Sequence, residues 1–170
     1  MRPFLPALLL LALAPAVRAA DPPPPPCPAP EARQFDFWIG EWDVSDFGQP
    51  AGRNTIRPIL DGCVLQENWR GVSGSAGTSL NFWDPERQRW RQLWVWREGT
   101  TLELEGAFRD GAMVLEGASK GRKGEPQRNR ISWSQNPDGT VRQHWEVSKD
   151  DGKTWKTEFD GEYVRVKGKK

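Results

Sequence analysis

The sequence predicts an all-β protein with one domain, a single antiparallel meander barrel of about 8–10 strands. Turn signals recur about every 8–12 residues after residue 42, and several are the Asp-Gly pairs that hairpins favour. The runs between them alternate in polarity, and none keeps a sustained helical period, so any helix is expected to be a short cap. A chain of 170 residues is long enough for one core.

The predicted domain opens with an aromatic octet. Residues 35–42 read Phe-Asp-Phe-Trp-Ile-Gly-Glu-Trp, and their alternation from Phe35 onward predicts an extended chain. Phe35 and Phe37 are interpreted as ordinary core residues. Gly40 removes a side chain where another backbone comes close, and Trp42 is interpreted as an indole that plugs one end of the barrel.

The same octet resembles the start of a lipocalin-like barrel. The calycin group, which joins lipocalins and fatty-acid-binding proteins, begins its first strand with Gly-x-Trp, matched here by Gly40 and Trp42. The full string, Phe-Asp-Phe-Trp-x-Gly-x-Trp, resembles an exported bacterial family with a lipocalin-like domain and no assigned function. The resemblance covers about residues 33–166. It implies that a basic side chain from the last strand, Arg165, stacks on Trp42 to close the barrel; the alternative is an exposed Arg beside Lys167.

Residues 1–20 predict a secretory signal peptide. Arg2 gives a positive start, an apolar run follows that is too short to span a bilayer, and residues 17–20 offer a small-residue cleavage site. The protein is therefore expected to be exported to a periplasmic or extracellular space, with no integral membrane segment after cleavage. Removal of Arg2 and Arg18 leaves 22 Lys and Arg against 23 Asp and Glu, a balance that does not favour a nucleic-acid partner.

A proline-rich stretch, residues 21–32, predicts an irregular strap or linker before a barrel domain at residues 33–167. Cys27 lies in this strap, and Cys63 is the only other cysteine. Export to an oxidising space predicts a disulfide between them. Cys27 is too far from the cleavage site for a lipid anchor. The chain has no Cys-x-x-Cys and one histidine, so no metal site is predicted.

The richest strand pair is predicted at residues 89–97 and 101–108. Arginine and glutamate share one face of this pair, which we place outside. The inward face, together with a late-strand indole, predicts the lining of a ligand cavity: Trp90, Gln92, Trp94, Trp96, Leu102, Leu104, Phe108 and Trp145. Such a wall, apolar with a few polar groups, suits a small apolar or amphipathic molecule. The alternative, in which these side chains fill a solid core, stays open.

No catalytic site is predicted. Glu103 and Glu105 are expected on the solvated face, whereas a glycosidase needs its acid in a dry site. His144 is the only histidine, so no triad can form. Haem-binding barrels of the nitrobindin kind use a late-strand histidine, which makes haem at His144 an alternative, although no cofactor is predicted. The alternation places His144 on the polar face with Arg142 and Glu146, as a surface or rim residue.

Three loops have distinct predictions. Residues 148–155 match the Asp-box pattern Ser-x-Asp-x-Gly-x-Thr-Trp of sialidase propellers. Propellers carry several copies, so the one copy here predicts only a hairpin, in which the Asp150 side chain binds backbone groups of the turn. Residues 71–77 predict a flexible rim loop. Asp160-Gly161 is interpreted as a further turn.

The sequence therefore favours an exported, lipocalin-like, non-catalytic protein that binds a small apolar or amphipathic molecule. One alternative is an enzyme with isomerase, cyclase or haem-dependent chemistry on the same kind of barrel. The other is a filled barrel with a structural or interaction role.

Overall fold

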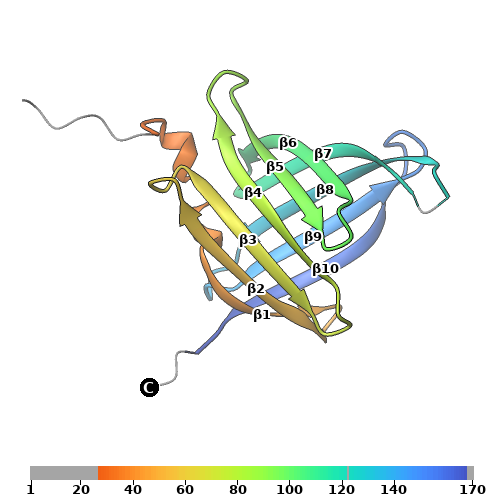
Figure 1. Cartoon of the computed structure of the whole chain (residues 1–170), viewed down its shortest axis with the longest axis horizontal. Coiled ribbons are helices and arrows are strands. Elements are labelled where there is room, and N and C mark those ends of the chain that lie inside the picture. Colours follow the sequence, from red (N-terminus) through yellow and green to blue (C-terminus); the bar gives the residue numbers. More distant parts are fainter. Residues whose placement is uncertain (1–26, 122, 168–170) are drawn as a thin grey trace, which may run out of the picture.

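A closed antiparallel barrel of ten strands forms the body of the protein in a computed structural model that describes residues 27–121 and 123–167 (Figure 1). Each strand pairs with its neighbours in sequence, and the first pairs with the last. The strands are β1 (Gly40–Asp46), β2 (Gln49–Ile59), β3 (Val64–Gly71), β4 (Ala76–Asp84), β5 (Arg89–Trp96), β6 (Thr101–Arg109), β7 (Ala112–Lys120), β8 (Pro126–Gln135), β9 (Val141–Ser148) and β10 (Lys156–Arg165). The predicted all-β meander barrel is confirmed. The predicted signal peptide lies outside the described residues.

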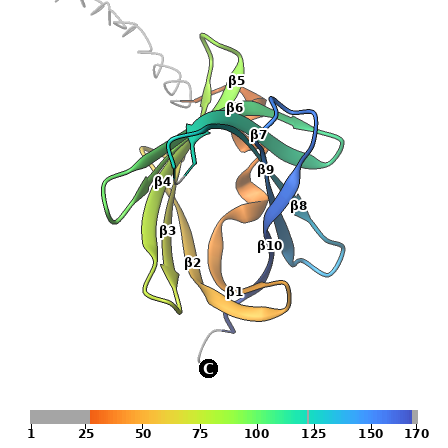
Figure 2. The same cartoon turned by 90° about the vertical axis from the view of Figure 1, so that its right-hand side faces the viewer.

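Two short 3₁₀ helices precede the barrel, η1 (Pro30–Arg33) and η2 (Asp36–Trp38). Neither is long and apolar enough to cross a membrane, and no other helix occurs in the described chain. In Figure 2 the orange segment that holds them lies within the ring of strands. We call this segment the plug, and the end of the barrel that it fills the closed end.

The plug corrects the prediction that residues 35–40 are extended. Phe35 and Trp38 are both fully buried, and their rings stack with centroids 4.9 Å apart. Side chains three residues apart eclipse in a 3₁₀ helix, so this turn buries both rings on one face, whereas an extended chain would send them to opposite faces. The first strand consequently begins only at Gly40.

The closed end is a fully buried aromatic core. Phe35 packs edge-on against Trp90 and Trp133, at centroid distances of 5.6 and 5.3 Å. Trp38 lies 5.5 Å from Trp133, and Trp42 lies 6.2 Å from Tyr163. All of these side chains are at most 1% exposed. Plug and barrel therefore share one hydrophobic core.

The seam between β1 and β10 closes the barrel. Trp42 and Arg165 are direct register partners, and the guanidinium carbon of Arg165 lies 4.3 Å from the centre of the Trp42 ring. Arg165 Nη1 also donates to the carbonyl of Ile39 at 3.1 Å, and Trp42 Nε1 donates to the carbonyl of Trp38 at 2.9 Å. Gly40 has a φ of 152°, and a Cβ there would collide with the Arg165 guanidinium. The seam thus requires glycine at this position.

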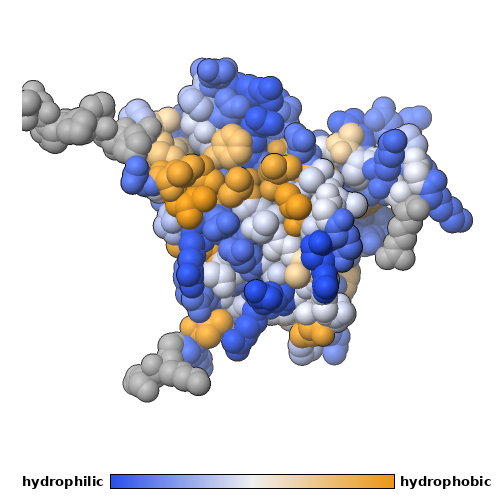
Figure 3. All heavy atoms as spheres, viewed as in Figure 1, coloured by the Kyte–Doolittle hydropathy of each residue, from blue (hydrophilic) through white to orange (hydrophobic). Residues whose placement is uncertain are grey.

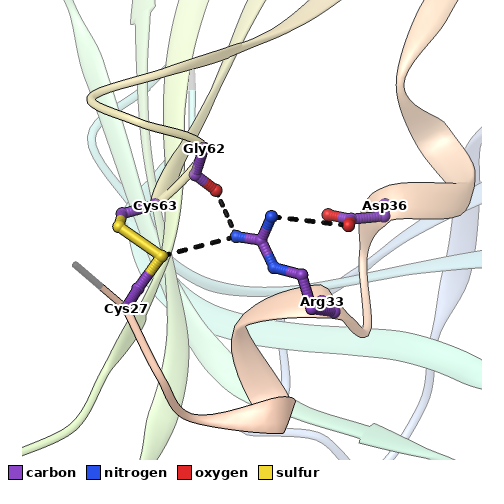
Figure 4. Close-up of a disulfide and its surroundings, with 5 residues drawn as sticks. All are labelled: Cys27, Arg33, Asp36, Gly62 and Cys63. Carbon is purple, nitrogen blue, oxygen red and sulfur yellow. Dashed lines mark hydrogen bonds and ion pairs between the residues drawn. A yellow bond between two sulfur atoms is a disulfide. The ribbon is translucent and has the colours of Figure 1, made fainter. Parts of the chain in front are cut away.

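A disulfide joins Cys27 to Cys63, with Cα atoms 5.6 Å apart, as predicted (Figure 4). Arg33 lies beside it, donates to the carbonyl of Gly62, and forms a 3.6 Å ion pair with Asp36. Desolvation raises the pKa of Asp36, while the positive charge of Arg33 opposes the rise. The disulfide and Arg33 together fasten the plug to the turn that precedes β3. Because η1 starts at Pro30, the last part of the predicted strap is helical.

The Asp160-Gly161 turn prediction is wrong, since β10 runs through both residues. A register shift between Thr157 and Phe159 bends this strand, and the Phe159 ring lies over Gly161 where a Cβ would otherwise stand. Asp160 forms an ion pair with Arg142 of β9 at 2.7 Å. Here the glycine makes room for a ring.

Strand β4 has an unusual polarity. Ser79 and Asn81 are buried, whereas Leu80 is 38% exposed on the outer surface opposite Leu93, which is 36% exposed. Figure 3 shows apolar side chains gathered over the face on which β3, β4 and β5 lie in Figure 1. Strand β4 therefore has polar side chains inside the barrel and contributes to an apolar patch on the outer surface.

Candidate functional site

A cavity of about 420 Å³ occupies the barrel beyond the plug, at what we call the open end. Its mouth is formed by the β1–β2 and β3–β4 connections with the adjacent strand ends: Asp46, Gln49, Pro50, Ala51, Val72, Ser73 and Ser75. Seven aromatic residues line it: Trp69, Trp94, Trp96, Trp133, Trp145, Phe159 and Tyr163. The remaining lining residues are Glu67, Gln92, Leu102, Ile131 and Gln143. Part of the segment predicted as a rim loop, residues 71–77, stands at this mouth.

The cavity brings together five of the eight residues predicted to line it. Gln92, Trp94, Trp96, Leu102 and Trp145 line it, whereas Trp90, Leu104 and Phe108 are absent from its lining. Trp90 is covered by the plug, because it packs against Phe35 and its Nε1 donates to Gln34 at 3.3 Å. Phe108 lies 6.2 Å from Phe37 of the plug, and Leu104 is buried in the core.

Cross-strand rows order the cavity wall by depth. Glu67 pairs with Ser79, and Ser79 with Trp94, so these three form the deeper row. One step closer to the mouth, Trp69 pairs with Gly77, and Gly77 with Trp96. The Trp94 ring lies over Gly77, where a Cβ would collide with it. The glycine therefore fixes where the Trp94 indole can lie.

Aromatic pairs stiffen this wall. Trp94 and Trp96 meet edge to face with centroids 5.7 Å apart, and Trp69 meets Phe159 in the same way at 6.5 Å. The indole nitrogens of Trp69 and Trp145 donate to Ser75 at 3.3 Å and to Asn129 at 3.1 Å. These bonds hold the rings in place around the space that they enclose.

A hydrogen-bonded network forms the floor of the cavity. Glu67 accepts from Asn54 at 2.7 Å and from Ser79 at 2.6 Å. On one side, Asn81 donates to Ser79 at 2.8 Å and accepts from Gln92 at 2.8 Å. On the other side, Asn54 donates to the hydroxyl of Tyr163 at 3.3 Å, and that hydroxyl donates to Gln143. We call these residues the floor network: Asn54, Glu67, Ser79, Asn81, Gln92, Gln143 and Tyr163.

Glu67 is the chemically distinctive member of the floor network. Burial raises its pKa to about 7, because desolvation outweighs the hydrogen bonds from Ser79 and Asn54. Burial and the nearby Glu67 carboxyl raise the pKa of the Tyr163 hydroxyl well above its usual value. The open end therefore holds an ionisable acid that changes its charge near neutral pH.

Sequence reasoning missed Glu67 and its direct hydrogen-bond partners, Asn54 and Ser79. The signal was present in β3, where Leu65, Glu67 and Trp69 are alternate residues and so share a face. In β4 the hydrophobic pattern pointed the wrong way, since Leu80 would be expected inside and Ser79 outside.

His144 is not among the residues that line the cavity. Its Nε2 lies 3.1 Å from Thr157 Oγ1, and its Nδ1 lies 3.8 Å from a carboxylate oxygen of Glu146. This position gives no support to the haem alternative. Within residues 27–121 and 123–167, no group of three His, Cys, Asp or Glu side chains could hold a metal ion.

The Asp-box segment forms the turn between β9 and β10. Asp150 accepts from the backbone and hydroxyl of Thr154 at 2.8 and 2.6 Å, and these hydrogen bonds lower its pKa to about 2. Trp155 donates to the carbonyl of Gly152 at 3.1 Å and stacks on Arg130 at 4.1 Å. These contacts stabilise the hairpin.

The fold and site define a ten-stranded barrel with one plugged end and an aromatic cavity at the other. Among known proteins, no family model matches the chain, and no curated protein sequence matches it either. The barrel agrees with the lipocalin-like resemblance, while membership of that family stays a prediction.

Proposed function

We propose that this protein is exported and binds one small amphipathic molecule in the open-end cavity without transforming it. The observation that carries the proposal is the cavity itself, whose volume of about 420 Å³ falls in the range of small-molecule sites. An apolar wall above a polar floor is the arrangement that fixes both the position and the orientation of such a ligand.

Export is supported by the disulfide. Cys27–Cys63 is the kind of bond that persists in oxidising spaces and is rare in the cytosol. The leader pattern in residues 1–20 supports the same location.

Binding of a neutral hydrophobic dye, N-phenyl-1-naphthylamine, tests the proposed function. Dye fluorescence should rise saturably with one site per chain. Ala51 stands in the cavity wall, so Ala51→Phe should fill part of the space and weaken binding by about tenfold. Ala107→Phe is the matched control, because Ala107 is exposed on β6, and it should leave binding unchanged. Non-saturable fluorescence, or equal effects of the two variants, would contradict the proposal.

A further inference from the structure

Two carboxyl side chains and no basic side chain line the cavity. Asp46 and Glu67 line it, and none of its lining residues is Lys, Arg or His. A guanidinium near the mouth, that of Arg97, is already engaged, since it donates to the carbonyl of Gly74 at 2.8 Å and lies 3.6 Å from Glu98. A carboxylate ligand such as a fatty acid would place like charge beside Glu67 in a site shielded from water, which is unfavourable.

The surroundings of the cavity do not reverse this balance. A second hollow at the open end shares Trp96, Leu102 and Trp145 with the cavity. Its lining holds three lysines and three glutamates: Lys120, Lys123, Lys149, Glu98, Glu125 and Glu158. Lys149 and Glu125 are paired at 3.0 Å. The neighbouring hollow therefore adds no net charge of either sign.

The aromatic wall favours a cation for a separate reason. Aromatic faces carry partial negative charge, and indoles are the strongest of the natural rings in attracting cations. Five of the seven aromatic residues that line the cavity are tryptophans. The protein already uses this interaction elsewhere, in the Arg165–Trp42 and Arg130–Trp155 stacks.

The indoles and the Glu67 carboxyl attract a cation at two different depths of the cavity. Glu67 lies in the deeper row with Trp94, and Trp69 and Trp96 lie in the row nearer the mouth. A charged head that entered past the outer indoles would reach the carboxylate at the floor. An apolar body attached to that head would then remain among the rings.

We propose that the preferred ligand is an organic ammonium ion, an amine on an aryl or alkyl body, whose charged nitrogen faces Glu67. This inference rests on the proposed function and specifies its ligand class. The amine N–H groups donate to the Glu67 carboxylate, and the body contacts Trp69, Trp94 and Trp96. The floor network holds the carboxylate in place through Asn54 and Ser79.

The burial of Glu67 predicts a second measurable property of amine binding, which is the release of protons. Because burial raises its pKa to about 7, most of this carboxyl is protonated in the empty cavity at about pH 6. A bound cation favours the ionised form, so binding at about pH 6 should release protons, and binding at about pH 8.5 should not. The titratable groups that share the cavity with Glu67 are Asp46 from β1 and Tyr163 from β10, among the residues described.

A matched series of probes tests the proposal by titration calorimetry: 4-phenylbutylamine, 4-phenylbutan-1-ol and 4-phenylbutanoate. These probes share one body and differ in the charge of the head. At about pH 7.5 the amine should bind about tenfold more tightly than the alcohol, and the carboxylate should bind most weakly. Titrations at about pH 6 in buffers of different ionisation enthalpy should show proton release with the amine.

Glu67→Gln is the decisive variant, because the amide keeps the size of the side chain and removes its charge. The preference for the amine over the alcohol should fall to within about threefold, and proton release should vanish, while binding of the neutral dye persists. Glu103→Gln removes one exposed carboxylate from β6 and should change neither property.

Equal or tighter binding of the carboxylate by the unaltered protein overturns the ammonium proposal. A preference for the amine that survives Glu67→Gln overturns it as well. In either case saturable dye binding would leave the broader proposed function intact. If neither the dye nor any of the three probes binds, both proposals fail together.

Discussion

The two ends of the barrel use the same residue type for opposite purposes. At the closed end, Trp38 of the plug and the barrel residues Trp90 and Trp42, which contact the plug, are at most 1% exposed. At the open end, Trp94 and Trp96 stand around a cavity of about 420 Å³ above a polar floor. Trp133 and Tyr163 belong to both regions, since they contact plug residues and also line the cavity. The reach of the plug therefore decides the role of each indole. An indole that the plug covers is part of the core, and an indole beyond the plug is part of the cavity wall.

Matched truncations at the two ends give the largest expected difference. Trp38→Ala should lower the free energy of unfolding by about 3–5 kcal/mol, because it leaves a void in a fully buried core. Trp96→Ala should cost only about 1–2 kcal/mol, since one side of that ring already faces the cavity. Urea unfolding monitored by circular dichroism measures both. Equal losses would contradict the distinction between the ends.

Loss of the disulfide should act at the closed end. Replacing both Cys27 and Cys63 by serine opens a loop with a sequence separation of 36 residues, for which the chain-entropy estimate is about 3–4 kcal/mol. Thermal or urea unfolding of oxidised wild type against the double variant measures the change. A reducing agent should destabilise the wild type and leave the double variant unaffected. If the reductant affects both proteins alike, the loss has another origin.

The open end should make stability depend on pH through Glu67. Its pKa is about 7 in the folded protein against 4.5 as the ordinary value, so the folded state binds more protons between these limits. The contribution of Glu67 to the free energy of unfolding is therefore greatest below pH 4.5. It falls by on the order of 3 kcal/mol as the pH rises through about 7.

Unfolding free energies measured from about pH 4 to pH 8 check this slope. Glu67→Gln removes the titrating group, so the difference between wild type and variant isolates its contribution. A difference that stays constant over the range would mean that the carboxyl is not desolvated in the folded protein.

The seam should show the smallest effect. A double-mutant cycle on Trp42→Phe and Arg165→Met should give a coupling energy of about 0.5–2 kcal/mol from the guanidinium stacked on the indole. Arg165 also donates to Ile39, a bond lost in both variants that carry Met, so it cancels in the cycle. A coupling near zero would show that the stack does not contribute to closure.

Period-two patterns made the barrel and several faces of its strands predictable. In β5, arginine and leucine alternate with tryptophan and glutamine. This alternation correctly predicted that Gln92 and Trp94 lie on the inner face. Alternation assigns a face but carries no information on depth. Trp90 and Trp94 therefore looked equivalent, although the plug covers only the first.

The features that sequence reasoning missed are those in which a tertiary requirement overrides a local pattern. The floor network needs polar side chains inside, so β4 turns Ser79 and Asn81 inward and exposes Leu80. The plug needs Phe35 and Trp38 on one side, so the chain makes a 3₁₀ turn where alternation favoured a strand. Neither requirement is visible in a window of a few residues.

Closure of the ring through β1 and β10 also has a consequence for how the chain reaches its native state. The Arg165–Ile39 and Asn54–Tyr163 hydrogen bonds join residues 126 and 109 positions apart, whereas most strand pairs are sequential hairpins. The entropy of closing such long loops is lost before their contacts form, which slows folding in proteins of high contact order. The meander can therefore assemble hairpin by hairpin, but the cavity floor exists only after the last strand has docked against the first.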